Sequence, residues 1–319
     1  MKSLLFLPDN GTALQVRRGS LRVRIGFGFA ETSYPPRVHG IRTIILAGQG
    51  VSITGEAIRW TAREGVELYL MGMSGEAFAI IGEAVGSDHR RSALAIRQRQ
   101  FSVVLDPRKR LEVARKIVVA KLRTLALHPV DTRAFREEIA GAGSILDLMA
   151  AEARAGGVYF SRFQGSELRF ADPTSPDHWR VFAARAAPVI KGLIGTSKAR
   201  NAATPIGALL NYTYAVALGQ CTRAVIGAGL DACHGFLHVP RQGRLSLSYD
   251  ILELHRADLT SAVFTHATKT LFVRGAFEQS RTGVVSLGPD VAKDMAKLAL
   301  SVATITACSK RVRQVLRWL

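Results

Sequence analysis

The sequence predicts an α+β protein in which a β-rich N-terminal part precedes an all-α remainder. Up to about residue 85, short runs of alternating apolar and polar residues are separated by turn residues, a pattern typical of strands. From about Asp106 onward, apolar residues recur at the spacing of helix turns. The length of 319 residues favours two domains, which we place at residues 1–88 and 95–319, although one large domain is an alternative.

The N-terminal part is predicted to contain strands and one short helix. Residues 14–26 alternate around Gly19 as in a half-buried β-hairpin. The other predicted elements are a strand, a helix ended by Gly65, and two strands around a short turn, at residues 43–48, 51–65, 66–72 and 77–82.

The remainder is predicted as a series of long helices. The first opens with Asp106 and Pro107, a favourable N-cap and first-turn pair. The helical segments are residues 106–128, 143–163, 204–229, 249–269 and 288–319, with a turn-rich stretch at residues 169–179. Residues 202–222 are uncharged, but they include polar residues and Arg223 follows, so we interpret them as a helix buried in protein and not a membrane span.

The formal net charge of +18 implies a polyanionic partner. Nucleic acid is the first candidate and an anionic membrane surface the second. Three cysteines, an odd number without CxxC spacing, fit reduced thiols and a cytoplasmic protein. The apolar run near the start is too short for a signal peptide.

One largely apolar segment combines an imidazole with two carboxylates. His238 precedes a short turn, and Asp250 and Glu253 follow three residues apart, so a helix would place both carboxylates on one face at its start. Such a group suits a divalent ion of moderate hardness, and Mn²⁺ accepts nitrogen more readily than Mg²⁺. The alternatives are an ordinary core histidine and carboxylates that complement a helix dipole.

A further carboxylate, Glu152, lies in a helical segment of Leu, Met and Ala. We predict that it shares a face with Leu146, Met149 and Ala153. A buried ionised carboxylate is costly unless it is paired or bound to metal. Glu152 is therefore a second candidate ligand, and the alternative is a salt bridge to one of the many arginines.

Several stretches together resemble a known family. They are "NAATPIGALLNYTYA", "AGLDACHGFLH", "LSLSYDILELHR" and the N-terminal "GVSITGEAIRWTAREGVELYLMGMSGE", with Glu152, Tyr159 and Phe160 in order upstream of the first three. They look like the CRISPR-associated integrase and endonuclease, the first Cas protein of spacer acquisition. The resemblance implies a β-rich dimerisation domain, an α-helical catalytic domain, a symmetric homodimer, and a complex with a small second Cas protein.

The resemblance also assigns the site. It implies that Glu152, His238 and Glu253 bind Mg²⁺ or Mn²⁺ and that Asp250 is an additional acidic group at the site. The implied reaction inserts a captured DNA fragment, the spacer, next to a CRISPR repeat by attack of its 3′-hydroxyl on a phosphodiester. Two alternatives stay open: a stand-alone nuclease of branched DNA with the same residues, and a non-enzymatic basic scaffold.

Clustered cations are the candidate DNA contacts. Each cluster could instead be a solvated face, but the total charge favours some contact with DNA. The candidates are Arg90, Arg91, Arg97, Arg99, Arg108, Lys109, Arg110, Lys198 and Arg200.

Overall fold

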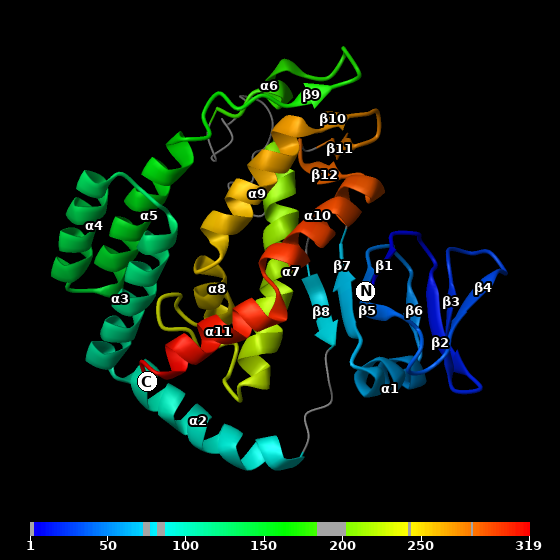
Figure 1. Ribbon diagram of the computed structural model, residues 1–319, viewed down its shortest axis with the longest axis horizontal. Helices are drawn as coiled ribbons and strands as arrows, with labels where there is room; N and C mark the ends of the chain where they lie inside the picture. Colours follow the sequence, from blue (N-terminus) through cyan, green and yellow to red (C-terminus); the bar gives the residue numbers. More distant parts are fainter. Residues whose placement is uncertain (1–2, 73–76, 82–86, 184–201, 242–243, 282) are drawn as a thin grey trace.

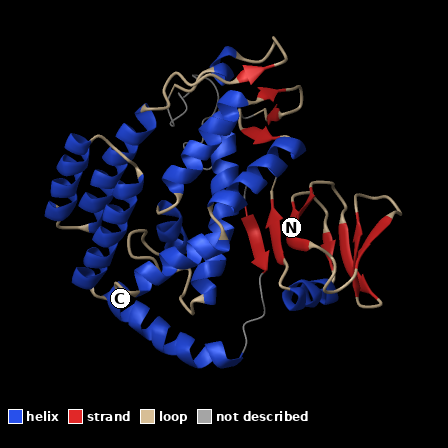
Figure 2. Cartoon of the chain, viewed as in Figure 1, coloured by secondary structure: helices blue, strands red, loops and turns tan. Residues whose placement is uncertain are grey.

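The computed structural model describes residues 3–72, 77–81, 87–183, 202–241, 244–281 and 283–319. Strands β1–β8 lie together on one side, and the long helices make up the rest of the molecule (Figures 1 and 2). The predicted α+β class is confirmed. The division at residues 1–88 and 95–319 stays a prediction, and helix α2 (Ser87–Leu105) runs through the segment between them.

The first N-terminal sheet has four strands in the order β1-β5-β7-β8, with β1, β5 and β7 parallel and β8 antiparallel. Their bounds are β1 Ser3–Leu7, β5 Ile41–Leu46, β7 Glu67–Met71 and β8 Ala77–Ile81. The predicted strands of this region are confirmed. Leu and Ile dominate these strands because both faces of the sheet are covered, one by α1 and one by α7.

The second sheet has the order β4-β3-β2-β6, with bounds Glu31–Tyr34, Ser20–Arg24, Ala13–Arg17 and Ser52–Ile53. Strands β2 and β3 form the predicted hairpin around Gly19. Helix α1 (Gly55–Glu64) follows β6 and is capped by Thr54, which accepts a hydrogen bond from the Ala57 amide. Gly65 ends it, as predicted, in the left-handed conformation at φ +64°.

The remaining helices form an assembly around α7, which packs against α8, α9, α10 and α11. Asp106 caps α3 and Pro107 is its first residue, as predicted. The bounds are α3 Pro107–Thr124, α4 Pro129–Gly141, α5 Ile145–Ser161, α6 Asp177–Arg180, α7 Pro205–Gly227, α8 Ser246–Glu253, α9 Arg256–Lys269, α10 Pro289–Val302 and α11 Ile305–Leu316.

The structure differs from the sequence prediction in several places. Strands β1 and β4 and helices α2, α4 and α6 were not predicted, and the helix predicted at residues 51–65 begins only at Gly55, after strand β6. Four short strands interrupt the helices, in two small sheets: β9 Arg169–Phe170 with β10 Leu271–Phe272, and β11 Phe277–Gln279 with β12 Val285–Leu287. Two segments predicted as single helices are each broken into a pair, α8–α9 and α10–α11. The first break repositions the candidate ligands.

Helix α7 is buried along most of its length. This position explains why the helix carries no charge before Arg223, because its neighbours are other helices and the first sheet. Among the described residues, no helix is long and apolar enough to cross a membrane.

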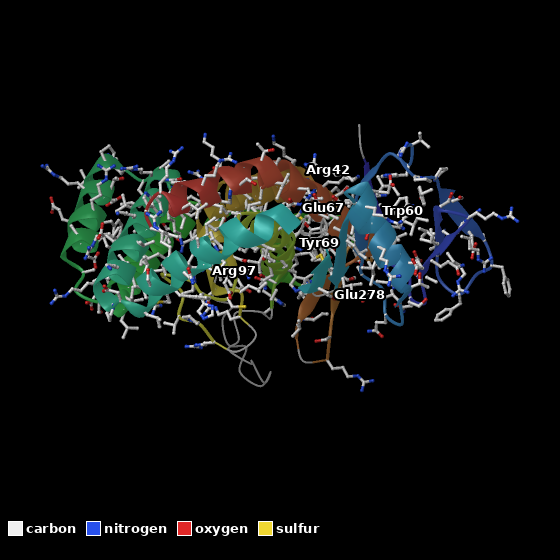
Figure 3. All side chains as sticks on the ribbon, turned by 90° about the horizontal axis from the view of Figure 1, so that it is seen from below. Arg42, Trp60, Glu67, Tyr69, Arg97 and Glu278 are labelled. Carbon is white, nitrogen blue, oxygen red and sulfur yellow. The ribbon has the colours of Figure 1, made fainter. Side chains whose placement is uncertain are left out.

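The junction between sheet and helices is both close and polar. Gly219 of α7 lies against the Tyr69 ring, and a Cβ at that position would overlap the ring. The buried Glu67 carboxylate accepts a hydrogen bond of 2.6 Å from Gln220 and pairs with Arg223, both on α7. Figure 3 shows Glu67 and Tyr69 where the strands meet the helices. An ionised carboxylate tolerates this burial because it is paired and hydrogen-bonded.

Candidate active site

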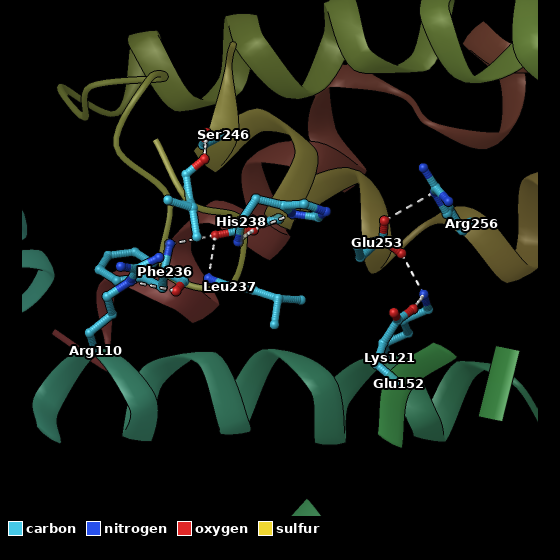
Figure 4. A network of polar contacts seen from close by, with 11 residues as sticks. Arg110, Lys121, Glu152, Phe236, Leu237, His238, Ser246, Glu253 and Arg256 are labelled. Carbon is cyan, nitrogen blue, oxygen red and sulfur yellow. Dashed lines mark hydrogen bonds and ion pairs between the residues drawn. The ribbon is translucent and has the colours of Figure 1, made fainter. Parts of the chain in front are cut away.

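The three candidate ligands lie in one pocket, although 101 residues of sequence separate Glu152 from Glu253. Glu152 comes from α5, His238 from the segment between α7 and α8, and Glu253 from the last position of α8. The pocket has a volume of about 480 Å³, and Lys121 and Arg256 also line it. Figure 4 shows the carboxylates of Glu152 and Glu253 close together at the Lys121 side chain.

Asp250 holds the segment that carries His238. The carboxylate is fully buried and accepts hydrogen bonds from the backbone amides of Phe236, Leu237 and His238, at 2.6, 3.1 and 3.0 Å. The same carboxylate lies 2.7 Å from Nδ1 of the His238 ring. Asp250 therefore does not line the pocket; it fixes the ring and leaves Nε2 as the nitrogen for a cation.

Two cations in the pocket were missed by sequence reasoning. The buried Lys121 ammonium contacts Glu152 and lies 2.5 Å from Oε2 of Glu253. Nε of Arg256 forms an ion pair of 3.2 Å with Oε1 of Glu253. The available signal was weak, because Lys121 is one lysine in a basic helix. The sequence left two interpretations of Glu152 open, a metal ligand and a salt bridge to an arginine. Glu152 lines the candidate metal pocket and also forms a salt bridge, but its partner is Lys121.

These cations change the ionisation of Glu253. Burial on its own would raise the pKa of this carboxyl, but the charges of Arg256 and Lys121 outweigh it and lower the pKa to about 2. Burial would also lower the pKa of Arg256, and the Glu253 carboxylate raises it instead. Glu253 is therefore an anion at neutral pH despite its burial.

The local helix geometry corrects two predictions. Asp250 and Glu253 do not begin a helix: they lie in the second half of α8, which ends at Glu253 before α9 starts at Arg256. The face of α5 predicted for Glu152 is also wrong, because Leu146 is 75% exposed. The buried residues of α5 are Leu148, Ala151, Ala155 and Tyr159, and Glu152 lies at the margin of that face.

The donor set fits a divalent cation of intermediate hardness. Two carboxylates and one imidazole line the pocket, and the imidazole is oriented by a buried carboxylate, as metal-binding histidines commonly are. The buried anions also need positive charge near them, which Lys121 and Arg256 supply in part. The residues therefore suit Mg²⁺ or Mn²⁺ better than zinc, which normally takes more nitrogen or sulfur.

Comparison with known proteins decides the family. A family model described as "CRISPR associated protein Cas1" matches residues 5–299. The chain belongs to the Cas1 family. The resemblance seen in the sequence is confirmed.

Curated Cas1 relatives are similar over most of the chain. "CRISPR-associated endonuclease Cas1 3" of Thermus thermophilus is 25% identical over 82% of this chain and 72% of its own length. "CRISPR-associated endonuclease Cas1 2" of Pyrobaculum aerophilum is 26% identical over 79% of each chain.

Solved structures share the Cas1 fold. A "Casposase bound to integration product" has a TM-score of 0.76 at 21% identity, covering 94% of this chain and 82% of the casposase. A Cas1 protein from Thermotoga maritima has a TM-score of 0.75 at 14% identity, covering 99% and 96% of the two chains. At these identities the likeness concerns the fold.

In this Cas1 chain, helix α2 and the start of α3 support the segment that carries His238. The buried Gln100 side chain donates hydrogen bonds to the carbonyl oxygens of Asp231 and His234, at 2.9 and 2.7 Å, and accepts one of 2.8 Å from the Asp231 amide. Arg110 Nε donates to the Phe236 carbonyl at 2.9 Å, and Arg97 Nε donates to the Gly229 carbonyl at 3.1 Å. Arg97 and Arg110 thus have structural contacts besides their predicted DNA role.

The other candidate DNA contacts are differently placed. Arg99, Arg108 and Lys109 are exposed on α2 and α3. Arg90 and Arg91 lie in α2, but their side chains are outside the described part of the structure. Lys198 and Arg200 lie outside the described residues.

Proposed function

We propose that this protein is a metal-dependent DNA integrase that inserts captured fragments into a CRISPR array. One observation carries the proposal: Glu152, His238 and Glu253, predicted as ligands from the sequence, line one pocket together with two cations. Membership of the Cas1 family supports it. So does the shared fold with a casposase bound to an integration product.

Glu152, His238 and Glu253 would hold Mg²⁺ or Mn²⁺, with Asp250 orienting His238. When bound, such an ion supplies Lewis acidity toward the phosphate and lowers the pKa of the attacking hydroxyl. The chain's own part is to keep the Glu253 carboxylate ionised. It also holds the imidazole ring still, with Nδ1 committed to Asp250.

Lys121 and Arg256 add fixed positive charge where a phosphodiester would react. Phosphoryl transfer spreads negative charge over the phosphate oxygens, and charges placed in advance stabilise it without reorganisation. Both side chains are already held by Glu253, so little conformational entropy is lost when the DNA binds. Neither residue needs to act as a covalent nucleophile.

The DNA substrates are a spacer fragment and the CRISPR repeat. The attacking group is the 3′-hydroxyl of the fragment, and the bond broken is a phosphodiester at the repeat boundary. A net charge of +18 supports binding of two duplex segments that repel each other. The exposed Arg99, Arg108 and Lys109 are the best-placed candidates among those with described side chains.

Hydrolysis of branched DNA is a second candidate activity of the same pocket. The pocket is open enough for water, which would replace the 3′-hydroxyl as the attacking group. The curated relatives are named endonucleases, which favours this candidate. The two activities differ in product, because integration joins strands and hydrolysis leaves them cut.

Two protein partners belong to the proposal. We place a homodimer contact on residues 1–88, where Phe27, Phe29 and Val38 are 81%, 98% and 77% exposed, since such apolar side chains are favoured at interfaces. We also propose a complex with a small second Cas protein. A "Cas6-RT-Cas1--Cas2 complex" shares the fold at a TM-score of 0.69 and 14% identity, over 98% of this chain and 34% of that one.

The decisive experiment is strand joining between a fluorescent DNA fragment and a plasmid that carries the repeat. We expect joined product with Mn²⁺ and none with a chelator. Glu152→Ala and His238→Ala should abolish joining while DNA retention survives, and Glu137→Ala, at an exposed position of α4, should behave as wild type. If plasmid or branched DNA is cut without joining, hydrolysis is the function. If the wild type does neither, the non-enzymatic scaffold stands.

A further inference from the structure

A second cluster of metal-binding side chains lies apart from the active site. Cys221 comes from α7, His255 from the break between α8 and α9, and Cys308 from α11. All three residues are buried, with exposed fractions of 0%, 4% and 0%. One sulfur or ring nitrogen of each lies within 4.8 Å of the others, and none of the three residues lines the active-site pocket.

The spacing of the two sulfurs matches tetrahedral coordination. The Sγ atoms of Cys221 and Cys308 are 3.7 Å apart. Two thiolates bound to zinc at about 2.3 Å with a tetrahedral angle would be about 3.8 Å apart, so an ion would fit between them with little movement. A disulfide would instead need the sulfurs to approach to about 2.05 Å, a much larger displacement in a close-packed interior.

His255 supplies an independent observation. Among the residues that the structure describes, its buried Nε2 has no hydrogen-bond partner of good geometry, although the ring lies near the Cys308 sulfur. A buried polar atom without a partner costs about 1–3 kcal/mol, so native structures rarely leave one unexplained. An ion between the two sulfurs would give the nitrogen lone pair a partner.

We propose that Cys221, His255 and Cys308 form a structural metal site for zinc or a similar thiophilic ion. Two thiolates and one imidazole are a donor set that zinc prefers and that Mg²⁺ does not. The Ala303 carbonyl oxygen, 3.7 Å from the Cys308 sulfur, or a water molecule would complete four ligands. Binding deprotonates both thiols and releases their protons to solvent.

The ionisation of the thiols agrees with this site. A hydrogen bond from Cys221 and the nearby imidazole of His255 lower the pKa of Cys308 to about 6, against the opposing effect of burial. The same contacts would favour the thiolate form of Cys308 when a metal binds. Burial and the Cys308 contact raise the pKa of Cys221, which would lose its proton on binding.

The site would tie together three elements that the chain joins only through long connections. It would connect α7 and α11 to the α8–α9 break. Glu253 and Arg256, which line the active-site pocket, lie on either side of His255 in this break. An ion bound to His255 would therefore also hold these two pocket residues in place. Its role is structural, and it takes no part in the reaction.

Zinc content of the full-length protein tests the proposal. We expect about one tightly bound zinc per chain after dialysis with reductant, and with cobalt a thiolate-to-metal charge-transfer band. Cys221→Ser, Cys308→Ser and His255→Gln should lose this zinc. Cys233→Ser should keep it, because Cys233 is an exposed cysteine outside the cluster. A Glu152→Ala, His238→Ala double variant should keep it as well, which separates this site from the active site.

Other results would overturn the proposal. Folded wild type that binds no zinc and shows no cobalt–thiolate band would do so, as would equal zinc in the cysteine variants and the wild type. Loss of two hydrogens from the intact mass, with a Cys221–Cys308 crosslink in peptide mapping, would show a disulfide instead. If the Cys221, Cys308 and His255 variants do not fold, measurements on the wild type still test the zinc site. Its cobalt spectrum and a melting temperature lowered by a zinc chelator are expected, and absence of both contradicts the site.

Discussion

Asp250 determines where His238 lies. A fully buried carboxylate that accepts three backbone hydrogen bonds and contacts Nδ1 of the His238 ring has no capacity left for substrate. The family resemblance suggested that Asp250 lies at or near the metal. Its contacts show instead that it positions His238. Its effect on the reaction therefore passes through the imidazole and the segment at residues 236–238.

Asp250→Asn should lower joining or cleavage about 10–100-fold, because the amide group cannot accept all four contacts. Affinity for Mn²⁺ should weaken in parallel, measured by titration calorimetry. Asp294→Asn, at an exposed position of α10, is the matched control. Normal Mn²⁺ affinity in a folded Asp250→Asn protein would contradict the positioning role.

Lys121→Met should make the thermal stability of the protein depend more strongly on bound Mn²⁺. Without the ammonium, Glu152 and Glu253 repel each other in a buried pocket, and breaking such a pair costs about 3–5 kcal/mol. Mn²⁺ should restore part of this loss, so the Mn²⁺-induced rise in melting temperature should exceed that of wild type. Lys116→Met, on the same helix with a side chain 40% exposed and paired with Glu112, should show the wild-type rise. An equal or smaller rise in Lys121→Met would argue against the ammonium as their counter-ion.

Glu253 gives the protein a specific acid sensitivity. Its pKa is about 2 in the folded protein against an ordinary value of 4.5, so its contribution to stability is complete above 4.5 and is lost as the pH falls toward 2. The free energy of unfolding, from urea titrations at about pH 5 and pH 3, should fall less in Glu253→Gln than in wild type. Glu137→Gln, at an exposed position, is the control and should lose as much unfolding free energy between pH 5 and pH 3 as wild type. An equally large loss in Glu253→Gln would refute this assignment.

At the scale of elements, the break between α8 and α9 decides the site. The apolar periodicity of residues 249–269 predicts one helix, and neither Gly nor Pro marks the interruption. The chain turns at Leu254 and His255, and the burial of both side chains indicates that tertiary packing imposes the break. Local pattern therefore located the helical residues but could not show that Glu253 ends one helix and Arg256 begins another.

Helix α2 acts on the site through Gln100. Gln100→Ala removes three hydrogen bonds to Asp231 and His234 and leaves buried backbone groups without partners, which should destabilise the protein by about 1–3 kcal/mol. Hydrogen exchange at residues 229–238 should speed up, and joining should decline with it. Gln98→Ala, exposed on the same helix, should change neither. Unchanged exchange in Gln100→Ala would show that α2 does not anchor this segment.

At the scale of the whole molecule, the sequence revealed more of the fold than of the site. The hairpin, the caps of α1 and α3 and the change from strands to helices follow from periodicity and cap residues, which are local. The pocket depends on contacts between α3, α5 and the α8–α9 break, which no local pattern encodes. Residue type and spacing made Glu152, His238 and Glu253 candidates, and the family resemblance assigned them as the ligand set. Lys121 was missed because a buried lysine and a surface lysine look alike in a basic helix.

The charge of the whole chain should make DNA binding strongly dependent on salt. Replacing Arg108 and Lys109 together by Ala should lower the slope of log binding constant against log salt by about 2, since each phosphate contact contributes about 0.9. Fluorescence anisotropy across salt concentrations measures it. Arg59→Ala with Arg63→Ala on α1 should leave the slope unchanged. An unchanged slope in the first variant would remove this cluster from the DNA interface.

The missing side chain at Gly219 has a consequence for how this protein can evolve. Any methyl group there would push against the Tyr69 ring and separate the strands from the central helix, disturbing Glu67 and its partners as well. In a saturation library selected for folding, position 219 should return glycine alone, unless a smaller residue at 69 arises in the same clone. Positions 69 and 219, far apart in the gene, can therefore change only together, because their atoms are in contact.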